Sequence, residues 1–557
     1  MENKTTISVC KNCQKDFVIE PDDFGFYERI GVPAPQLCPE CRMQRRLAFN
    51  NLLSLHKRPC DLCGEDSISL FAPNARYKVY CPKCWWSDDW DPFEYGKDFD
   101  FSRPFFEQFD ELLHEVPLLG LSLDYPSNIN SPYNNECGPL KNCYLLFYGV
   151  ECEETATGFY LVQAKNLLDT SLAMWSQWCY DCRNIAKNNR CIGVENTTES
   201  IDCAFLRNCR NCQNCFGSAN LKNKKFVFFN EQLTKNEYET RIANYDLGSY
   251  AGYKKAKADA KTHWAKYPPK PIWMDFSVNC TGNYIFDSKN CNNCFEVSSS
   301  EDMRHSFSVK RSKDCADMIG HCRTSELLYN GVGVGAGSRK VICSWWVESS
   351  QDVEYSFATR QSNNCMGCDA IKNGSFVILN KKYSKEEYKK IKDHIIKELK
   401  EKDVYGDFLP SELCPFGYNE TIAQDNMPLT KEEAIEQGFC WEDNIQKTEG
   451  KETIKVEEIP DNIKDIPDDF INEVLVCTEC SRNYKLISRE LNFYKKMIIP
   501  IPRNCWNCRF LERLFCRGPY KFWKRNCDKC QKEITTNYAP DRPEIVYCES
   551  CYNKEVY

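Results

Sequence analysis

The chain has 557 residues, 42% of them hydrophobic, and a formal net charge of -8, so it is long enough for several packed domains and general disorder is excluded. It has no apolar run of about 18 residues and no apolar signal-peptide core, so we expect neither a membrane span nor secretion. We therefore expect a cytoplasmic protein, in which 37 cysteines indicate metal thiolates and buried thiols rather than disulfides.

Residues 1–90 carry four Cys-x2-Cys pairs, a spacing typical of zinc sites. In the first two pairs we expect a knuckle on a hairpin followed by a pair at a helix start, where the helix dipole favours thiolates. The other two pairs predict a zinc ribbon on a β-hairpin, with strands at 68–70 and 78–80. The predicted metal ligands here are Cys10, Cys13, Cys38, Cys41, Cys60, Cys63, Cys81 and Cys84.

Residues 474–557 repeat this array with every cysteine shifted by 467 positions and no insertion or deletion, which indicates a duplication. Each quartet of thiolates would close a tetrahedral site and leave no open position for catalysis. We expect about four Zn²⁺ ions in the whole chain, although rubredoxin-like iron would use similar ligands. The predicted ligands in this second double zinc-finger module are Cys477, Cys480, Cys505, Cys508, Cys527, Cys530, Cys548 and Cys551.

The first quartet of each module resembles a probable treble-clef zinc-ribbon family. The motif that carries the resemblance is Phe26-Tyr27, Gly31, Pro33 and Cys38-Pro39-Glu40-Cys41-Arg42. The second copy departs from it, with Ile498 in place of the glycine and Trp506 in place of the proline that follows the third cysteine. The whole chain resembles uncharacterised bacterial zinc-ribbon proteins with a Cys/Asn-rich middle. This resemblance implies treble-clef modules and zinc, and it implies no particular activity.

Residues 91–136 are acidic and aromatic, and they predict a capping helix and linker. Ser102 can cap the helix, with Pro104 in its first turn. The next residues place one apolar face on that helix, which we expect to pack against the following domain; an acidic-aromatic docking surface is the alternative. The residues of this face are Phe105, Phe106, Phe109, Leu112 and Leu113.

Through the middle of the chain, short apolar runs recur at near-regular intervals, separated by Asn, Asp and Cys, which predicts a β-solenoid. We expect each corner Asn to bond the backbone of the neighbouring coil and each Cys to fill the narrow interior. Residues 221–238 parallel residues 371–388, so the solenoid is also duplicated. The predicted blocks are 137–230 and 280–380, closed by helical caps at 231–279 and 381–440 with helices near 235–265 and 384–402.

Residues 441–473 are acidic with two prolines, which predicts a flexible linker to the second zinc module. The expected fold is therefore mainly β: duplicated treble-clef and zinc-ribbon modules at both ends of the chain flank a two-block β-solenoid with capping helices.

Basic residues next to the zinc ligands are candidate nucleic-acid contacts, since they lie among aromatic groups suited to stacking. The alternative is a solvated face over a structural zinc core. Each zinc with four thiolates adds about two negative charges, which weakens the electrostatic case for nucleic acid. The candidates are Arg42, Arg46, Arg509, Arg513, Lys524 and Arg525.

No catalytic signature is present. The spacing Cys209-x2-Cys212-x2-Cys215 lacks the fourth cysteine of a ferredoxin run, and the Gly331–Gly337 run lacks the ending of a phosphate loop. We expect a zinc-binding, non-catalytic binding or scaffold protein without a membrane partner; its partner is undetermined, with nucleic acid or another protein as candidates. The alternatives are an enzyme or polymer-binding protein that uses a solenoid groove, and a thiol-based metal or redox protein.

Overall fold

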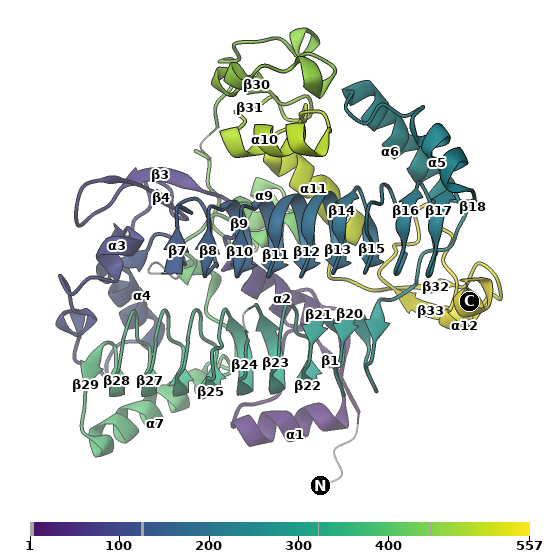
Figure 1. The fold of residues 1–557 in the computed structure, drawn as a ribbon. Coiled ribbons are helices and arrows are strands. Elements are labelled where there is room, and N and C mark those ends of the chain that lie inside the picture. The colour runs from purple at the N-terminus through teal and green to yellow at the C-terminus, as the bar shows by residue number, and fades with distance from the viewer. Residues whose placement is uncertain (1–4, 124–126, 321, 446, 557) are drawn as a thin grey trace. The chain divides into compact units, whose positions relative to one another are not determined.

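The computed structural model describes residues 5–123, 127–320, 322–445 and 447–556 (Figure 1). The chain divides into two compact units, each assembled from two separate segments. Unit 1 comprises Met1–Gly120 with Ile272–Ile445, and unit 2 comprises Leu121–Pro271 with Gln446–Tyr557. The first cysteine module therefore belongs with the second solenoid block, and the second module belongs with the first block.

Most neighbouring coils of the solenoids repeat at an interval of 12 residues, so that Asn184 contacts Asn196. In unit 2 the parallel register joins Lys165 to Gln177 and Gln177 to Asn189, and bridges continue to Ile201 and Gln213 at the same interval. Two coils of unit 1 are longer by a single residue, since their register steps from Lys313 to Glu326 and on to Arg339. Figure 1 shows the strands of each block side by side in a row. The coils therefore follow a regular register, whereas the apolar runs of the sequence had suggested uneven spacing between strands.

Within each coil, nearly every third residue has a positive φ near 50°, as at Asn184, Lys187 and Arg190. Twelve residues per coil with a left-handed residue at every third position give about four corners and very short sides. The left-handed region is costly for most residues and least so for Asn, Asp and Gly. This explains the many Asn residues of the middle segment.

The residue after each corner points into the coil, so the inward positions also recur every third residue. In unit 1 this interior includes Cys291, Cys294, Val297 and Met303, all 0% exposed. Inward serines join neighbouring coils, since the Ser300 amide donates to Ser288 Oγ at 3.2 Å and the Ser312 amide donates to Ser300 Oγ at 3.2 Å. The sequence Asn-Cys therefore encodes a corner followed by a small interior side chain.

The corner asparagines form ladders through their side chains. The Nδ2 atoms of Asn184, Asn196 and Asn208 each donate to the Oδ1 atom of the Asn at the same corner of the next coil, at 2.8, 3.3 and 3.2 Å. We expected these amides to bond the backbone of the next coil; here they bond each other because stacked corners repeat the same residue type. Inward asparagines do bond the backbone, as Asn188 Nδ2 donates to the Thr197 carbonyl at 2.9 Å.

Both solenoids close in the same way at their C-terminal ends. The last coil turns back into an antiparallel strand, β18 after β17 and β29 after β28. Asn230 bonds both backbone groups of Ala219, and Asn380 bonds both backbone groups of Asp369. A helix with a capping box follows each, Thr234 with Glu237 and Ser384 with Glu387. These helices protect strand edges that would otherwise be free to pair.

The elements of the two solenoids follow the chain in order. Those of unit 2 are β7 (Asn128–Ile129), β8 (Leu140–Lys141), β9 (Tyr144–Val150), β10 (Cys152–Glu153), β11 (Ala156–Val162), β12 (Lys165–Met174), β13 (Gln177–Ala186), β14 (Asn189–Ile192), β15 (Glu195–Thr198), β16 (Gln213–Phe216), β17 (Lys225–Phe228), β18 (Glu231–Gln232), α5 (Lys235–Ile242) and α6 (Tyr250–Trp264). Those of unit 1 are β19 (Met274–Asp275), β20 (Gly282–Phe286), β21 (Cys294–Ser298), β22 (Glu301–Arg304), β23 (Lys313–Ile319), β24 (Glu326–Val332), β25 (Arg339–Ile342), β26 (Gln351–Glu354), β27 (Asn363–Met366), β28 (Ser375–Ile378), β29 (Lys381–Lys382) and α7 (Lys385–Glu401).

The cysteine modules combine hairpins with helices. In unit 1 the elements are β1 (Thr6–Val9), β2 (Asp16–Ile19), α1 (Pro21–Ile30), α2 (Pro39–Ala48), β3 (His56–Pro59), β4 (Asp66–Ser69), β5 (Val79–Tyr80) and α3 (Pro82–Trp85), followed by η1 (Pro92–Tyr95), α4 (Phe105–Glu115) and β6 (Leu118–Leu119). In unit 2 they are β30 (Leu475–Val476), β31 (Asn483–Tyr484), α10 (Ser488–Met497), α11 (Trp506–Arg517), β32 (Trp523–Asn526), β33 (Glu533–Thr536) and α12 (Glu549–Val556).

Two local predictions differ from the structure. The sequence predicted a hairpin between residues 68–70 and 78–80, whereas β4 pairs with β3 and β5 pairs with β6. The predicted helix starts at Phe105 with Pro104 at its N-cap, and its aromatic face meets Tyr355 of the second solenoid block rather than the block that follows it in sequence. Both differences arise from partners distant in the chain.

The segments outside modules and solenoids are also packed. In unit 1, η3 (Ser411–Leu413), η4 (Tyr418–Glu420), α8 (Ile422–Asn426) and α9 (Lys431–Glu436) follow α7. The sequence predicted a flexible linker over 441–473. In unit 2 this segment forms η5 (Val456–Glu458), η6 (Ile463–Asp465) and η7 (Asp468–Asn472), and its few apolar residues are buried in the core: Ile459, Ile463, Ile466 and Phe470. Their burial outweighs the acidic composition of the segment.

The structure confirms the expected fold class. The molecule is mainly β, with a two-block β-solenoid in the middle, helices after each block and a cysteine module at each end of the chain. Within the described ranges, no helix combines the length and the apolar character needed to cross a bilayer.

Candidate metal centres and a charged pocket

The structure gathers the sixteen terminal cysteines into four quartets, two in each unit. Within each quartet the four Sγ atoms all lie within 4.8 Å of one another. The quartets are Cys10, Cys13, Cys38 and Cys41; Cys60, Cys63, Cys81 and Cys84; Cys477, Cys480, Cys505 and Cys508; and Cys527, Cys530, Cys548 and Cys551. In the described part of the chain, no other group of three or more Cys, His, Asp or Glu side chains converges in this way.

The quartets fit a tetrahedral metal thiolate. A Zn–S bond of about 2.3 Å in tetrahedral geometry requires sulfur atoms about 3.8 Å apart. Cys13 and Cys38 have their Sγ atoms 3.7 Å apart, as do Cys480 and Cys505. The same distance separates the Sγ atoms of Cys530 and Cys548. The donor set and its spacing are therefore those of a closed four-thiolate site.

The backbone around the quartets prepares the thiolates. Each begins with the same knuckle, in which the residue after the second cysteine has a positive φ and donates its amide to the carbonyl of the first; these residues are Gln14, Gly64, Ser481 and Gln531. Burial alone would raise the pKa of Cys10, but backbone amide donors lower it to about 6. The same opposition lowers the pKa of Cys527 to about 6. Cys38 and Cys505 are the N-caps of α2 and α11, where the helix dipole also favours negative charge.

Two buried arginines join each module to its solenoid block. In unit 1, Asp317 on β23 accepts Arg42 Nε at 2.9 Å and lies 3.0 Å from Arg46 Nη2. In unit 2, Asp169 on β12 lies 2.7 Å from Arg509 Nε and 3.7 Å from Arg513 Nη2. Burial would raise the pKa of Asp317, but the two guanidinium charges lower it overall. We name these groups the arginine-pair anchors.

The sequence analysis missed the two aspartates of the anchors. Asp169 and Asp317 occupy left-handed corners, with φ of 50° and 57°. Both are almost completely buried, with exposures of 1% and 0%. The available signal was an acidic residue inside an otherwise apolar run, Leu167-Leu168-Asp169 and Cys315-Ala316-Asp317. A buried carboxylate in such a run needs a cationic partner to stay ionised.

The six candidate nucleic-acid residues lie in different environments. Arg42, Arg46, Arg509 and Arg513 are 0–8% exposed and engaged in the anchors, so they are not available on the surface. Arg525 is largely buried and donates to the Asp528 carboxylate at 3.3 Å and to the Ala539 carbonyl at 3.4 Å. The equivalent residue of unit 1, Arg58, donates to Asp61 and Ala72 in the same way. Lys524 is exposed and 3.3 Å from Glu533.

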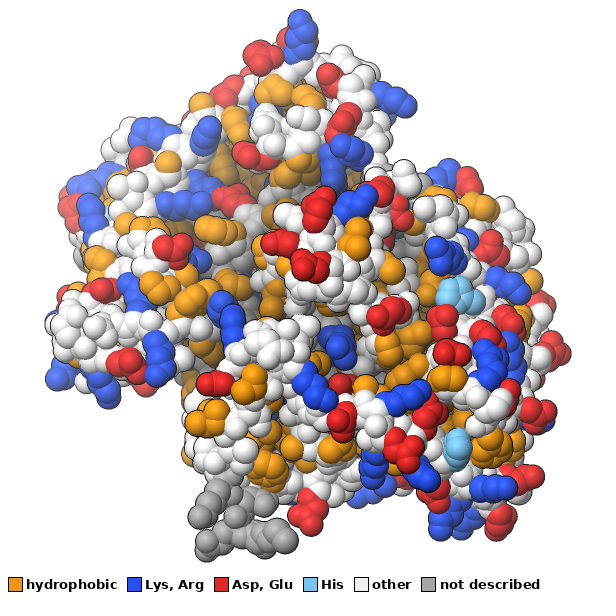
Figure 2. Space-filling model, turned by 180° about the vertical axis from the view of Figure 1, so that it is seen from behind, with side chains coloured by type: hydrophobic (Ala, Val, Ile, Leu, Met, Phe, Trp, Pro, Cys, Tyr) orange, Lys and Arg blue, Asp and Glu red, His pale blue; other side chains and the backbone are white. Residues whose placement is uncertain are grey.

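Surface charge does not gather into a single basic field on the face seen in Figure 2, where basic and acidic side chains are interspersed. A nucleic-acid interface generally presents clustered positive charge. Nucleic-acid binding remains a prediction, and Lys524 is the candidate whose side chain is free of the packed core.

The cysteines of the solenoids serve as interior side chains. Cys209, Cys212 and Cys215 lie at successive inward positions of one coil and are 0–3% exposed. Each thiol donates to the carbonyl two residues before it, at 3.4 Å. The three do not converge as a metal-binding group, so the iron–sulfur interpretation gains no support. The Gly331–Gly337 run likewise lies within the coils rather than at a strand-to-helix phosphate loop.

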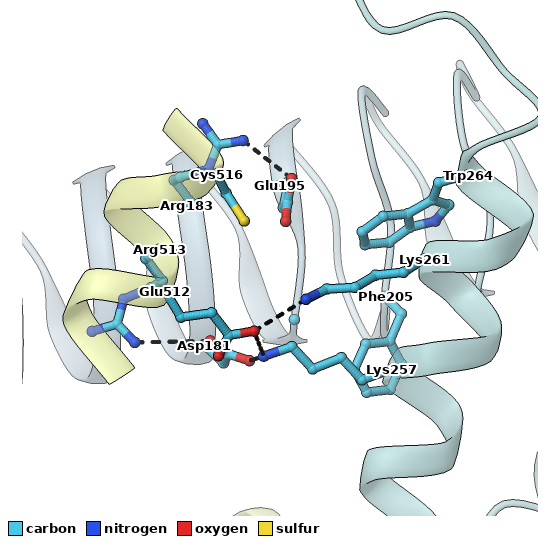
Figure 3. A pocket seen from close by; sticks show the side chains of 11 residues that line it. Asp181, Arg183, Glu195, Phe205, Lys257, Lys261, Trp264, Glu512, Arg513 and Cys516 are labelled. Carbon is cyan, nitrogen blue, oxygen red and sulfur yellow. Dashed lines mark hydrogen bonds and ion pairs between the residues drawn. The ribbon is translucent and has the colours of Figure 1, made fainter. Parts of the chain in front are cut away.

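Unit 2 contains a charged pocket between its solenoid, α6 and α11 (Figure 3). Lys257 and Lys261 extend from α6 toward Glu512 on α11, and each Nζ lies 3.0 Å from Glu512 Oε1. Lys257 Nζ is also 2.8 Å from Asp181 Oδ2. Burial would raise the pKa of Glu512, but the two lysines lower it to about 2. Arg183 and Glu195 form a further pair at 3.1 Å across the same pocket.

The corresponding place in unit 1 is filled by aromatic rings. Subtracting 467 from Cys516 of the unit 2 pocket gives Phe49, which is 1% exposed. Its ring lies 5.8 Å from Trp345 and 5.1 Å from Phe408, measured between centroids. Burial raises the pKa of the Cys516 thiol to about 11. The duplicated frame therefore encloses an apolar core in unit 1 and a network of charges in unit 2.

No protein-family model and no curated protein matches this chain. Among solved structures, the chain has a weak similarity to a presumed acetyltransferase from Desulfovibrio desulfuricans G20, at 10% identity and a TM-score of 0.12. That match covers 41% of this chain and 62% of the other. A similarity of this size carries no argument about fold or activity.

Proposed function

We propose that this chain is a zinc-stabilised, non-catalytic binding or scaffold protein of the cytoplasm. Each cysteine module would hold two Zn²⁺ ions, the first quartet as a treble clef and the second as a zinc ribbon. The proposal rests on sixteen cysteines that meet as four closed quartets in two duplicated modules. Four thiolates per ion leave no position for a substrate, so the metal would serve structure.

The anchors support a scaffold role for the modules. Each module directs two arginines from the helix that carries its second cysteine pair into a buried aspartate of a solenoid coil. Metal binding would fix that helix relative to the hairpin of its module, and the arginines would then hold the coil. The solenoid blocks would act as rigid spacers that present their outer faces to a partner, for which nucleic acid and another protein remain the candidates.

Counting metal in single-site variants tests this proposal. We expect about four zinc ions per chain by elemental analysis, and about three in Cys508→Ser, because one quartet is broken. Cys516→Ser is the matched control, since it lies on the same helix outside the quartets, and it should keep all four. Removing the metal with a chelator should abolish the near-UV dichroism of the modules.

Other metal counts contradict the proposal. A content well above four would favour thiol-based metal storage in the solenoid, and an unchanged content in Cys508→Ser would remove the quartets from the argument. Storage is disfavoured by the burial of the solenoid thiols, because a reactive or exchangeable cysteine needs exposure and a low pKa. Burial instead raises the pKa of Cys143 to about 11 and of Cys315 to about 12. Hydrogen bonds with Cys179 and Cys203 lower the pKa of Cys191 to about 6, but that thiol is 0% exposed.

A further inference from the structure

Unit 2 has a cavity of about 600 Å³ next to the charged pocket. It lies between the solenoid, α6 and the segment that leads into α11, and it shares Asp181, Lys257 and Glu512 with that pocket. Ligand pockets in proteins have volumes of about 300–1,000 Å³. The cavity is therefore large enough for a small organic molecule.

Three of the four acidic residues that line this cavity are paired with cations, and the fourth, Glu479, is exposed. Asp169 is held by Arg509 at 2.7 Å, and Asp181 and Glu512 share Lys257. Glu512 has Lys261 as a second cation at 3.0 Å. A cationic ligand would have to compete with these pairs, so the cavity does not favour positive charge.

Arg503 is the buried cation of the cavity without a carboxylate at ion-pair distance in the described ranges. It is 6% exposed, and it donates to the backbone carbonyls of Ile501, Ile459 and Pro460 at 3.2, 3.4 and 2.9 Å. A guanidinium has five N–H donors, so two remain. The Cζ atom of Arg503 lies 4.6 Å from the centroid of the Tyr250 ring, a cation–π contact that helps to orient the guanidinium.

The lining of the same cavity includes a further basic residue. Lys254, exposed on α6, lines the cavity and forms no ion pair with the described residues. The carboxylate of Asp461 accepts from the Ser249 hydroxyl and the Ala251 amide, and it forms no ion pair with Arg503 within the described ranges. A ligand oxyanion would give Arg503 the charged partner that these residues do not supply.

The equivalent cavity of unit 1 has an excess of acidic residues in its lining. It measures about 360 Å³ and also lies beside a Pro-x-Pro segment, but Gln36 takes the place of Arg503. Its acidic residues are Glu28, Asp403 and Asp407, with Lys400 as the basic residue of its lining. The buried arginine is thus a feature of unit 2 and not a requirement of the duplicated frame.

We propose that the unit 2 cavity binds a small organic oxyanion, with the anionic head group on Arg503 and Lys254. Phosphate and carboxylate head groups share this recognition chemistry, and the volume leaves room for an organic body beside the tyrosine rings. The cavity borders one cysteine quartet, since Cys508 is part of its lining. The zinc proposal is tested by counting metal, so it stays intact if no oxyanion binds.

Calorimetric titration of the zinc-loaded full chain tests the site with glycerol 3-phosphate, orthophosphate and succinate as probes. We expect saturable one-to-one binding of at least one probe, weakened at least tenfold in Arg503→Gln and several-fold in Lys254→Ala. Arg503→Gln installs the residue of unit 1 and should fold, which retained zinc content would verify. Lys496→Gln is the control, because that lysine lines a different cavity of the same unit.

The pattern among probes identifies the head group. Binding of both phosphates without succinate assigns a phosphate site, and the reverse assigns a carboxylate site. Absence of saturable binding for all three probes at about 10 mM would overturn the proposal, as would equal affinity in Arg503→Gln and the unaltered chain. If Arg503→Gln loses zinc, the affinity of Lys254→Ala for the probes becomes the test, because an exposed lysine can be removed without disturbing the core. An affinity equal to that of the unaltered chain would then overturn the proposal.

Discussion

Units 1 and 2 are two versions of one frame. Each has two cysteine quartets, an arginine-pair anchor, a solenoid of regularly repeating coils and a closing asparagine. They differ beside the anchor, where Phe49 packs on Trp345 in unit 1 and Cys516 borders a network of lysines and carboxylates in unit 2. They differ again at the Pro-x-Pro segment, where Gln36 corresponds to Arg503.

The comparison of the two units distinguishes residues that maintain the fold from residues that could form a binding site. Residues shared by both units hold the modules on the solenoids, so they follow from the architecture. Residues that differ, and that place charge where the sister unit is apolar, are not needed for that architecture. A buried charged network stabilises less than an apolar core of the same volume. The architecture shared by the two units therefore does not require this network.

Breaking the anchors should have the largest effect. Asp317→Ala leaves Arg42 and Arg46 buried without a carboxylate, and we expect a loss of about 3–5 kcal/mol in the free energy of unfolding. Asp169→Ala should cost less, because Arg509 keeps Glu490 at 3.4 Å and Arg513 keeps Asp181 at 3.8 Å. Chemical denaturation followed by circular dichroism measures both.

The control for the anchors lies on the same strand, β23. Asp314 pairs with the half-exposed Arg29, and such surface pairs contribute about 0–1 kcal/mol. Asp314→Ala should therefore be nearly neutral. If Asp317→Ala were equally mild, the anchors would not hold the modules.

The second comparison concerns the stability lost by truncating equivalent residues in the aromatic core of unit 1 and in the charged pocket of unit 2. Phe49→Ala should cost about 3–5 kcal/mol, because it opens a cavity in a packed core where the side chain is 1% exposed. Cys516→Ala, at the equivalent position of unit 2, should cost less than about 1 kcal/mol. Thermal unfolding of the two variants measures the ratio, and equal losses would contradict the distinction between the units.

A pH-dependent effect concerns Asp369, which is completely buried in unit 1 and corresponds to Ala219 of unit 2. Burial raises the pKa of Asp369 well above its usual value and outweighs the backbone amide of Ala370, which lowers it. By distance and angle, neither carboxyl oxygen accepts a hydrogen bond within the described ranges. The folded state keeps the proton while the unfolded state releases it above pH about 3.9. Stability is therefore lost as pH rises from about 4 toward the folded pKa, by at most about 1.4 kcal/mol per pH unit.

Asp369→Ala removes this dependence and installs the residue of unit 2. We expect the variant to match the unaltered chain near pH 4 and to be more stable at pH 7. The measurement is the difference in melting temperature between the two proteins at each pH, which cancels the pH response of the cysteine quartets. A difference independent of pH would show that Asp369 ionises normally in the folded state.

Much of this molecule follows from local sequence. The 467-residue shift predicted both cysteine modules, and the Asn-Cys pattern predicted a β-solenoid, since corner and interior preferences are properties of single residues. The regular period of the coil was hidden because inward positions accept Cys, Ser, Val and Leu alike. The linker at 441–473 was misjudged for a related reason, since its four buried apolar residues are few in an acidic segment.

What the sequence determined by itself is the set of parts: four cysteine quartets, two solenoid blocks and the helices that follow them. The tertiary structure alone decided how the parts combine, with the first module on the second block and the second module on the first. Both modules carry the same arginines and both blocks carry a matching buried aspartate, so local chemistry permits either pairing. The choice depends on the packing of whole surfaces, which no short segment encodes.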